Sequence, residues 1–267
     1  MSNLKKIRRA IPVAAVAAGV LFSAFRTGDK PVLLQKISSA GGNTRIHYNM
    51  DNTVQQLLIT NKSEFGDYTT ARIPVYENGR LTGTRISETE ENGSERPFSR
   101  LQYESGSNRI SQVQYLLGEQ VNSYDSLVYN TNGQVIAKYY FAKQATNGQF
   151  ASQNCQQYTW DQKGNVTRME NLGRTSTQAD FKLVSAVDYT YDSKPNAHLQ
   201  IPGMAFITDI APTNMSANNI TSETLTTIAT GKQQTGTYTY TYNARKYPVR
   251  VVYNTGAERF STSLEWK

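Results

Sequence analysis

From Val32 onward the chain is dominated by segments in which apolar and polar residues alternate. Residues 237–242 alternate Thr and Tyr strictly, and residues 134–141 and 250–253 are rich in β-branched and aromatic side chains. A period of two is typical of β-strands, and this region contains no window with sustained helical spacing. The pattern therefore predicts an all-β fold.

A short unit recurs seven times in this region. In each copy an aromatic residue ends a strand, a turn rich in Asn, Asp or Gly follows, and an aliphatic residue opens the next strand. The seven aromatic residues are Tyr48, Tyr76, Tyr103, Tyr129, Trp160, Tyr191 and Tyr242. Successive copies are 28, 27, 26, 31, 31 and 51 residues apart, which is two strands and two turns each until the final gap. This spacing predicts an up-and-down antiparallel meander of about 14–16 strands, built from repeated hairpins and strongly curved or barrel-like.

The turns of the repeat carry residues suited to left-handed backbone. Gly79, Gly133 and Gly164 occupy one slot of the repeat, and glycine accepts a positive φ without steric cost. We expect a side chain at these positions to be costly, and we expect Gly148, in a less regular linker, to tolerate one. The positions predicted to be structural turn residues are Tyr76, Gly79, Tyr129, Gly133, Trp160, Gly164, Tyr191 and Tyr242.

The long final gap contains an irregular insertion at residues 196–219. Pro202 and Pro212 interrupt any strand there, because proline cannot donate to a β-ladder. A long excursion in a regular sheet indicates a functional loop or a plug over one end of the sheet. The apolar residues of the insertion favour a plug, although a bound ligand would use the same side chains. These candidate plug or ligand-loop residues are Ile201, Met204, Phe206 and Ile207.

The N-terminus has the pattern of an export signal. Four basic residues within the first nine are followed by an apolar run over residues 10–25, which is too short for a comfortable membrane span of about 20 apolar residues. We predict a signal peptide at 1–24 and a linker at 25–31, with a single β domain at 32–267. The end of the run resembles a lipobox, but Phe25 stands where the acylated cysteine would be. Retention of the segment as a membrane anchor is the alternative to cleavage.

The charge and the cysteine and histidine content of the chain exclude some classes of function but do not indicate a specific one. The net charge is +7, but without residues 1–24 the chain has 24 basic against 21 acidic side chains. The basic residues are dispersed rather than clustered, which excludes a nucleic-acid-binding surface. With one cysteine and two histidines, the chain can form neither an internal disulfide nor a thiolate cluster, and an imidazole-based metal site is not expected.

The residues that could carry chemistry have simpler interpretations. Asp188 with Asp192, and Asp161 with Glu170, are the carboxylate pairs that a glycosidase would need. Acids at such positions usually serve turns or a solvated strand face. His47, His198 and Cys155 lack the neighbouring motifs of a nucleophilic site. We therefore predict no catalytic residue, no cofactor and no metal site.

The repeat unit, aromatic-Asp/Asn-x-x-Gly-x-aliphatic, resembles the YD repeat of RHS-type surface proteins. The order of features over 189–196, 216–221 and 238–249 is similar to a family of uncharacterised YD-repeat-like (RHS-like) envelope lipoproteins of Gram-negative bacteria with a porin-like fold. The resemblance spans residues 32–267 and implies an envelope location and that fold. The departures are Phe25 in place of cysteine and residues 244–246 in place of an acidic-Gly turn.

These observations predict a non-enzymatic exported protein of the periplasm, outer membrane or cell surface, with a binding or structural role. An integral outer-membrane pore is the main alternative, although residues 84–91 and 222–227 lack the apolar face of a lipid-facing strand. A glycan-cleaving enzyme is a third hypothesis. The expected partner classes are a glycan or an envelope protein, and the N-terminus offers a route to membrane association. The 17 tyrosines suit cross-strand packing or a ring-lined ligand surface.

Overall fold

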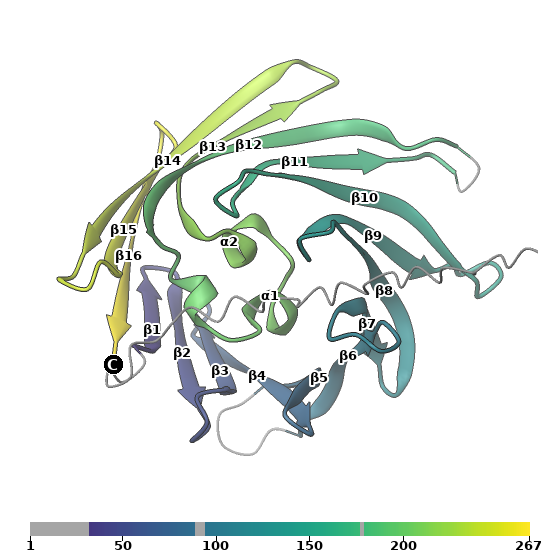
Figure 1. The fold of residues 1–267 in the computed structure, drawn as a ribbon, viewed down its shortest axis with the longest axis horizontal. Coiled ribbons are helices and arrows are strands. Elements are labelled where there is room, and N and C mark those ends of the chain that lie inside the picture. The colour runs from purple at the N-terminus through teal and green to yellow at the C-terminus, as the bar shows by residue number, and fades with distance from the viewer. Residues whose placement is uncertain (1–31, 89–93, 177–178) are drawn as a thin grey trace, which may run out of the picture. The chain divides into compact units, whose positions relative to one another are not determined.

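The sheet closes on itself to form a barrel (Figure 1). The computed structural model describes residues 32–88, 94–176 and 179–267, so the predicted signal peptide, Phe25 and the linker at 25–31 lie outside the described residues. Within the described part, sixteen antiparallel strands pair in chain order, and β1 (Leu34–Ser39) pairs with β16 (Arg259–Trp266). The predicted all-β meander is confirmed, and the barrel is closed.

The remaining strands have these bounds: β2 Gly42–Tyr48, β3 Val54–Asn61, β4 Tyr68–Glu77, β5 Arg80–Ser87, β6 Arg96–Tyr103, β7 Ile110–Leu117, β8 Gln120–Tyr129, β9 Val135–Lys143, β10 Phe150–Trp160, β11 Val166–Gly173, β12 Lys182–Pro195, β13 Asn218–Thr227, β14 Lys232–Tyr242 and β15 Pro248–Asn254. Three short helical segments separate β12 from β13: the 3-10 helix η1 (His198–Gln200), α1 (Met204–Ile207) and α2 (Pro212–Met215). Among the described residues, no helix is long and apolar enough to cross a membrane.

Alternation along each strand sorts side chains between the lumen and the outer wall. In β14 the tyrosines at 238, 240 and 242 are half-buried, while the threonines between them are exposed. Tyr240 lies opposite Val251 of β15, which packs into an apolar cluster with Leu34 and Leu264. In this strand the tyrosine face therefore points into the barrel, and the threonine face lies on the outer wall.

The aromatic residue of the repeat links each hairpin to the one before it. Its hydroxyl or indole N–H donates a hydrogen bond to the backbone carbonyl of the aliphatic or proline residue that opens a strand in the preceding copy. The bonds are Tyr48 to Leu34 (2.8 Å), Tyr103 to Leu81 (2.6 Å), Tyr129 to Ile110 (2.7 Å), Trp160 to Val135 (2.8 Å), Tyr191 to Val166 (2.5 Å), Tyr240 to Ile220 (2.8 Å) and Trp266 to Pro248 (2.7 Å). Tyr76 lies in the corresponding position near the end of β4 and is half-buried. These bonds lie at one end of the barrel, where the turns of the repeat join the strands. We call this end the rim.

The rim differs from the sequence-based assignment at two positions. Tyr240, not Tyr242, makes the rim bond of the last hairpin, because the hydroxyl of Tyr242 donates to the carboxylate of Asp192. Trp266 adds a further copy that the repeat pattern did not include. Because Trp266 pairs with Leu34 across the β1–β16 seam, this last copy lies where the barrel closes.

Asx side chains and left-handed residues shape the rim turns. Asn130 Oδ1 accepts hydrogen bonds from the backbone N–H groups of Asn132 and Gln134, each at 3.0 Å. Asp161 does the same for Lys163 and Asn165, at 2.8 Å each. The turn glycines have φ values of 76° (Gly79), 78° (Gly133) and 84° (Gly164). In the divergent turn at 244–246, Lys246 adopts φ 67° without the freedom of glycine.

The expectation that Gly148 lies in a relaxed linker is wrong. Gly148 has φ 67°, in the same left-handed region as Gly133. Its N–H donates to the carbonyl of Gln144 at 2.9 Å, which closes the turn between β9 and β10. A side chain at Gly148 therefore meets the same backbone strain as one at Gly133.

The insertion between β12 and β13 lies inside the ring of strands at the rim end (Figure 1). Ile201, Met204 and Ile207 are buried against strand residues such as Leu34 and Leu57. Phe206 and Ile210 of the insertion join a second apolar cluster with strand residues such as Leu101, Val113, Leu127 and Val166. The insertion ends at residue 217 rather than at the predicted residue 219, because β13 begins at Asn218. It supplies core for both halves of the rim.

We expect Tyr129→Phe to lower the free energy of unfolding by about 1 kcal/mol, because the carbonyl of Ile110 loses its hydrogen bond to the hydroxyl. Tyr124→Phe is the matched control, since Tyr124 lies in the same strand and stacks on Phe141 without a hydroxyl partner among the described residues. Chemical denaturation of both variants measures the difference. Equal stabilities would contradict a structural role for the rim bond.

A second pair of variants tests the turns. Gly133→Ala should cost about 1–2 kcal/mol, because a Cβ atom there meets open space and only the positive φ opposes it. Gly41→Ala should cost nothing, since Gly41 lies outside the left-handed region and a Cβ atom would have Ser39 Oγ at 3.9 Å as its neighbour. Thermal melts compare the two, and a Gly133→Ala melt as high as that of Gly41→Ala would refute the assigned turn.

Candidate functional site

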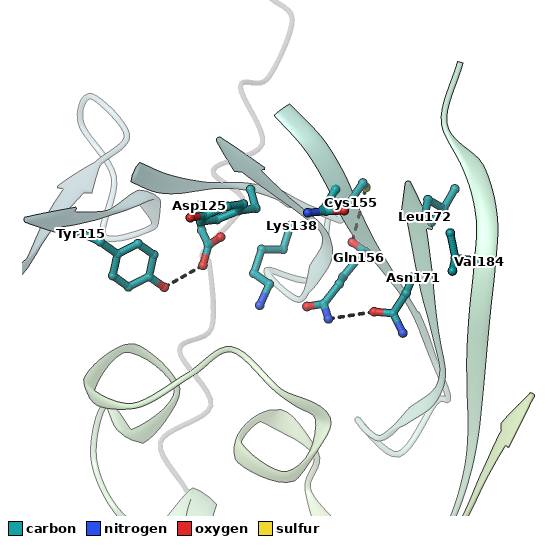
Figure 2. A pocket seen from close by; sticks show the side chains of 10 residues that line it. Tyr115, Asp125, Lys138, Cys155, Gln156, Asn171, Leu172 and Val184 are labelled. Atoms are coloured by element: carbon teal, nitrogen blue, oxygen red, sulfur yellow. Dashed lines mark hydrogen bonds between the residues drawn. The ribbon is translucent and has the colours of Figure 1, made fainter. Parts of the chain in front are cut away.

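The lumen contains a cavity of mixed polar and apolar lining on the side of the insertion away from the rim turns. Its volume is about 510 Å³, within the range of small-molecule sites. It is bordered by strands β7 to β12, and Figure 2 shows its side chains above the helical segments. The lining residues are Tyr115, Asp125, Lys138, Tyr140, Asn154, Cys155, Gln156, Asn171, Leu172 and Val184.

A carboxylate lies at the bottom of the cavity. Asp125 is only 4% exposed, and its Oδ2 accepts a hydrogen bond of 2.8 Å from the hydroxyl of Tyr115 (Figure 2). Burial raises the pKa of Asp125 above its ordinary value, and the ammonium group of Lys138 opposes that shift. Asp125 Oδ1 has no hydrogen-bond partner among the described residues, so one oxygen of this carboxylate is free to accept from a ligand.

The insertion forms the floor of the cavity through one backbone carbonyl. The carbonyl oxygen of Ile210 accepts from Tyr158 at 3.1 Å and from Lys138 Nζ at 3.4 Å. Tyr158 is buried, and burial raises the pKa of its hydroxyl, which therefore stays protonated and donates. The position of Lys138 in the cavity thus depends on the insertion.

A row of side-chain hydrogen bonds crosses the cavity wall. Tyr158 donates to Gln156 Oε1 at 2.9 Å, and Gln156 Nε2 donates to Asn171 Oδ1 at 2.9 Å. Asn171 Nδ2 then donates to Ser185 Oγ at 3.1 Å. Because each amide has both its groups oriented by a partner, the wall is rigid and polar.

The other lining residues form the more open part of the cavity. Tyr140 is 38% exposed and Val184 is 54% exposed, so a ring and an aliphatic side chain face the solvent there. Cys155 is buried, and burial raises the pKa of its thiol. A thiol with a raised pKa is a poor nucleophile, so Cys155 contributes packing rather than reactivity.

The carboxylate pairs nominated from the sequence lie elsewhere. Asp188 accepts two bonds of 2.8 and 2.9 Å from Arg168, and Glu170 accepts one of 3.0 Å, on the outer wall. Asp161 caps a rim turn, and Asp192 accepts from Tyr242 and from the backbone N–H of Asn219. None of the four acids lines the cavity.

The histidines have structural surroundings. His47 is exposed on β2. His198 lies in the insertion with Nδ1 2.8 Å from Asn214 Oδ1, and burial lowers the pKa of its imidazole. No group of three or more His, Cys, Asp or Glu within the described residues could hold a metal ion.

The predicted turn residues occupy the rim, and Ile201, Met204, Phe206 and Ile207 pack in the core beneath the cavity. No sequence motif indicated Asp125, Lys138 or the amide row, the hydrogen-bonded amides of Gln156 and Asn171. One feature of the sequence did point to Asp125. It lies two positions before the buried Leu127, so both side chains are on the same face of the strand. This signal is weak, because polar residues fill so many positions of the repeat.

Comparisons with solved structures address the fold. A porin-like protein from Bacteroides uniformis ATCC 8492 is similar, with a TM-score of 0.50 and 10% identity over 88% of this chain and 95% of that chain. The fold is porin-like. A porin-like protein from Bacteroides vulgatus ATCC 8482 gives a TM-score of 0.48 and 11% identity over 88% of this chain and 99% of that chain. No family model and no curated protein matches the sequence.

We expect His198 to make stability fall at acid pH. Its pKa is lowered in the folded state, so the unfolded chain binds the proton more tightly. The associated stability is fully present above the unfolded pKa near 6.5 and is lost as the pH falls below it, by at most about 1.4 kcal/mol per pH unit. Thermal melts between about pH 7.5 and pH 5 should therefore drop further for the wild type than for His198→Gln. Parallel curves for the two proteins would contradict this assignment.

Proposed function

We propose that the chain is a non-enzymatic exported envelope or cell-surface protein, a barrel that works in water and binds a ligand in its lumen. The observation that carries this proposal is the distribution of charge: ion pairs lie on the outer wall, while two clusters of apolar side chains fill the rim end of the interior. A membrane barrel needs the opposite arrangement on its lipid-facing side.

The outer wall carries charged pairs on both sides of the barrel. Lys36 of β1 pairs with Glu265 of β16 at 3.3 Å, and Arg168 of β11 pairs with Asp188 of β12 at 2.8 Å. An Arg or Lys on a lipid-facing wall costs about 2–4 kcal/mol at the bilayer midplane. The ion pairs at these positions therefore support an outer wall that faces water.

The outer face of β13 and β14 is hydroxyl-rich. Thr224 and Thr235 lie opposite each other with their hydroxyl oxygens 3.0 Å apart, and Thr237, Thr239 and Thr241 are exposed. In addition, β1 has 6 residues and β15 has 7, shorter than the roughly 9–11 that a tilted membrane strand requires. The outer aromatic rings of Tyr124 and Phe141 stack on each other.

The lumen does not provide a channel at the rim end. Ile201 and Ile207 of the insertion are 2% and 1% exposed and pack against Leu34 and Leu57 of the wall. Opening a path there would expose this apolar core to water, at roughly 25 cal/mol for each Å² of apolar surface. A closed end and an open polar cavity suit binding better than conduction.

The cavity also lacks the groups of a hydrolase. Asp125 is the one carboxylate in its lining, whereas glycoside hydrolysis ordinarily needs two flanking carboxylates. The thiol of Cys155 has a raised pKa, which disfavours the nucleophilic form. These features support a binding role.

Export and envelope location rest on the N-terminal pattern and on the YD-like repeat. The basic residues and apolar run of 1–24 support cleavage by a signal peptidase, and Phe25 argues against lipidation. The rim bonds give the aromatic of the repeat a structural purpose, which supports its relation to YD repeats. A porin-like fold agrees with an envelope location.

Fractionation of a Gram-negative host that expresses the full chain tests this proposal. We expect the processed protein to be released by carbonate or high salt, to stay monodisperse without detergent and to leave dye-loaded liposomes sealed. Intact mass should show loss of residues 1 to about 24 and no lipid adduct. A detergent-dependent protein that makes liposomes leak would instead support an integral pore.

A further inference from the structure

The cavity above the insertion has a specific chemistry, and the following inference rests on the binding role proposed above. We infer that this cavity binds a short, uncharged glycan, with Asp125 and Lys138 hydrogen-bonding adjacent hydroxyl groups and the ring of Tyr140 packing on a sugar face. The ligand class follows from the free hydrogen-bonding groups, the local charge and the exposed ring.

The free groups at the cavity surface match hydroxyls. Asp125 Oδ1 has no partner among the described residues, and Lys138 uses one of its three ammonium protons on the Ile210 carbonyl. A sugar hydroxyl both donates and accepts, so adjacent hydroxyls can donate to Asp125 and accept from Lys138. The side-chain amide of Asn154, unpartnered within the described part of the chain, offers a further donor and acceptor in the lining.

Charge balance argues against an ionic ligand. Asp125 and Lys138 interact with each other, and among the described residues no other charged side chain lines the cavity. An anionic ligand would be repelled by the Asp125 carboxylate, and a cationic ligand would be repelled by the Lys138 ammonium group. A charged ligand would also lose its hydration shell beside Asp125 and Lys138, whose charges already compensate each other. This desolvation costs more than the new interaction gains. A neutral, hydroxyl-rich ligand avoids this penalty.

The open side supplies the apolar contact that a sugar needs. Tyr140 and Val184 are partly exposed there, and both border the same cavity as the amide row. An exposed aromatic ring packs on the C–H face of a sugar, while its hydroxyl remains available to water. The cavity thus combines a polar floor with an apolar side, as small-molecule sites commonly do.

The depth of the site indicates a chain end rather than the middle of a long polymer. The insertion closes the lumen beneath Lys138, through the bonds of Lys138 and Tyr158 to Ile210. A polymer therefore cannot pass through, and the ligand enters from the more open side, where Tyr140 and Val184 are exposed. With about 510 Å³ available, a terminal unit of one or a few sugars is the appropriate size.

Isothermal titration calorimetry on the processed full chain tests the inference. The probes are neutral disaccharides and trisaccharides (maltose, cellobiose, lactose, chitobiose and mannotriose), with dialanine and succinate as zwitterionic and anionic comparators. We expect at least one neutral sugar to bind and the comparators to fail. Asp125→Asn and Tyr140→Ala should each weaken that binding at least about tenfold, by loss of a charged acceptor and of a stacking surface respectively.

Asp188→Asn is the matched control, because it makes the same substitution on the outer wall and should leave binding unchanged. Thermal melts of all three variants verify folding, and Lys138→Gln provides a second cavity variant with the same expected loss if Asp125→Asn melts early. Absence of binding across the neutral panel, preference for dialanine or succinate, or equal binding by the cavity variants would overturn the inference. A protein that stays monodisperse without detergent yet binds no sugar would refute only the ligand, whereas detergent dependence would refute the proposed function.

Discussion

The aromatic-to-carbonyl hydrogen bond at the rim is the interaction on which the barrel depends. A hairpin alone is marginally stable, and a strand edge leaves backbone groups unpaired. Most repeats place an aromatic donor so that its ring fills the lumen edge while its polar atom reaches the carbonyl of the preceding hairpin, as Tyr129 does for Ile110. A single aromatic residue thus buries its ring and also fixes the position of its hairpin against the preceding one. Trp266 repeats the contact with Pro248 beside the β1–β16 seam, so the same interaction lies next to the point where the sheet closes.

The insertion resolves a problem that the repeat creates. A sixteen-strand barrel has a wide lumen, which hairpin side chains do not fill by themselves. Residues 196–217 enter the barrel at the rim, and Ile201, Met204 and Ile207 complete an apolar core with the strand residues. The outer wall can then be polar, because the core lies inside.

The candidate site also results from the packing of the insertion in the lumen. The insertion fills the rim end and stops at Ile210, whose carbonyl holds Tyr158 and Lys138 at the floor of the remaining space. Above that floor the lumen positions carry Asp125, Gln156 and Asn171 in place of aliphatic residues. Polar side chains buried at this depth are costly unless they are partnered or reach a ligand. The amide row is partnered, and one oxygen of Asp125 remains available.

The sequence was enough to predict the strand pattern, the repeat, the turn slots and the location of the insertion, because these depend on local alternation and on turn chemistry. It misplaced the last rim aromatic, since Tyr240 and Tyr242 lie in the same phase of one strand and only the position of Asp192 distinguishes them. It also misjudged Gly148, whose backbone is set by the closure of its turn. Closure of the barrel, burial of the insertion and the grouping of Asp125, Lys138 and Asn171 were decided by tertiary structure. Those residues come from three different strands, and their meeting depends on strand register and barrel curvature, which no local pattern encodes.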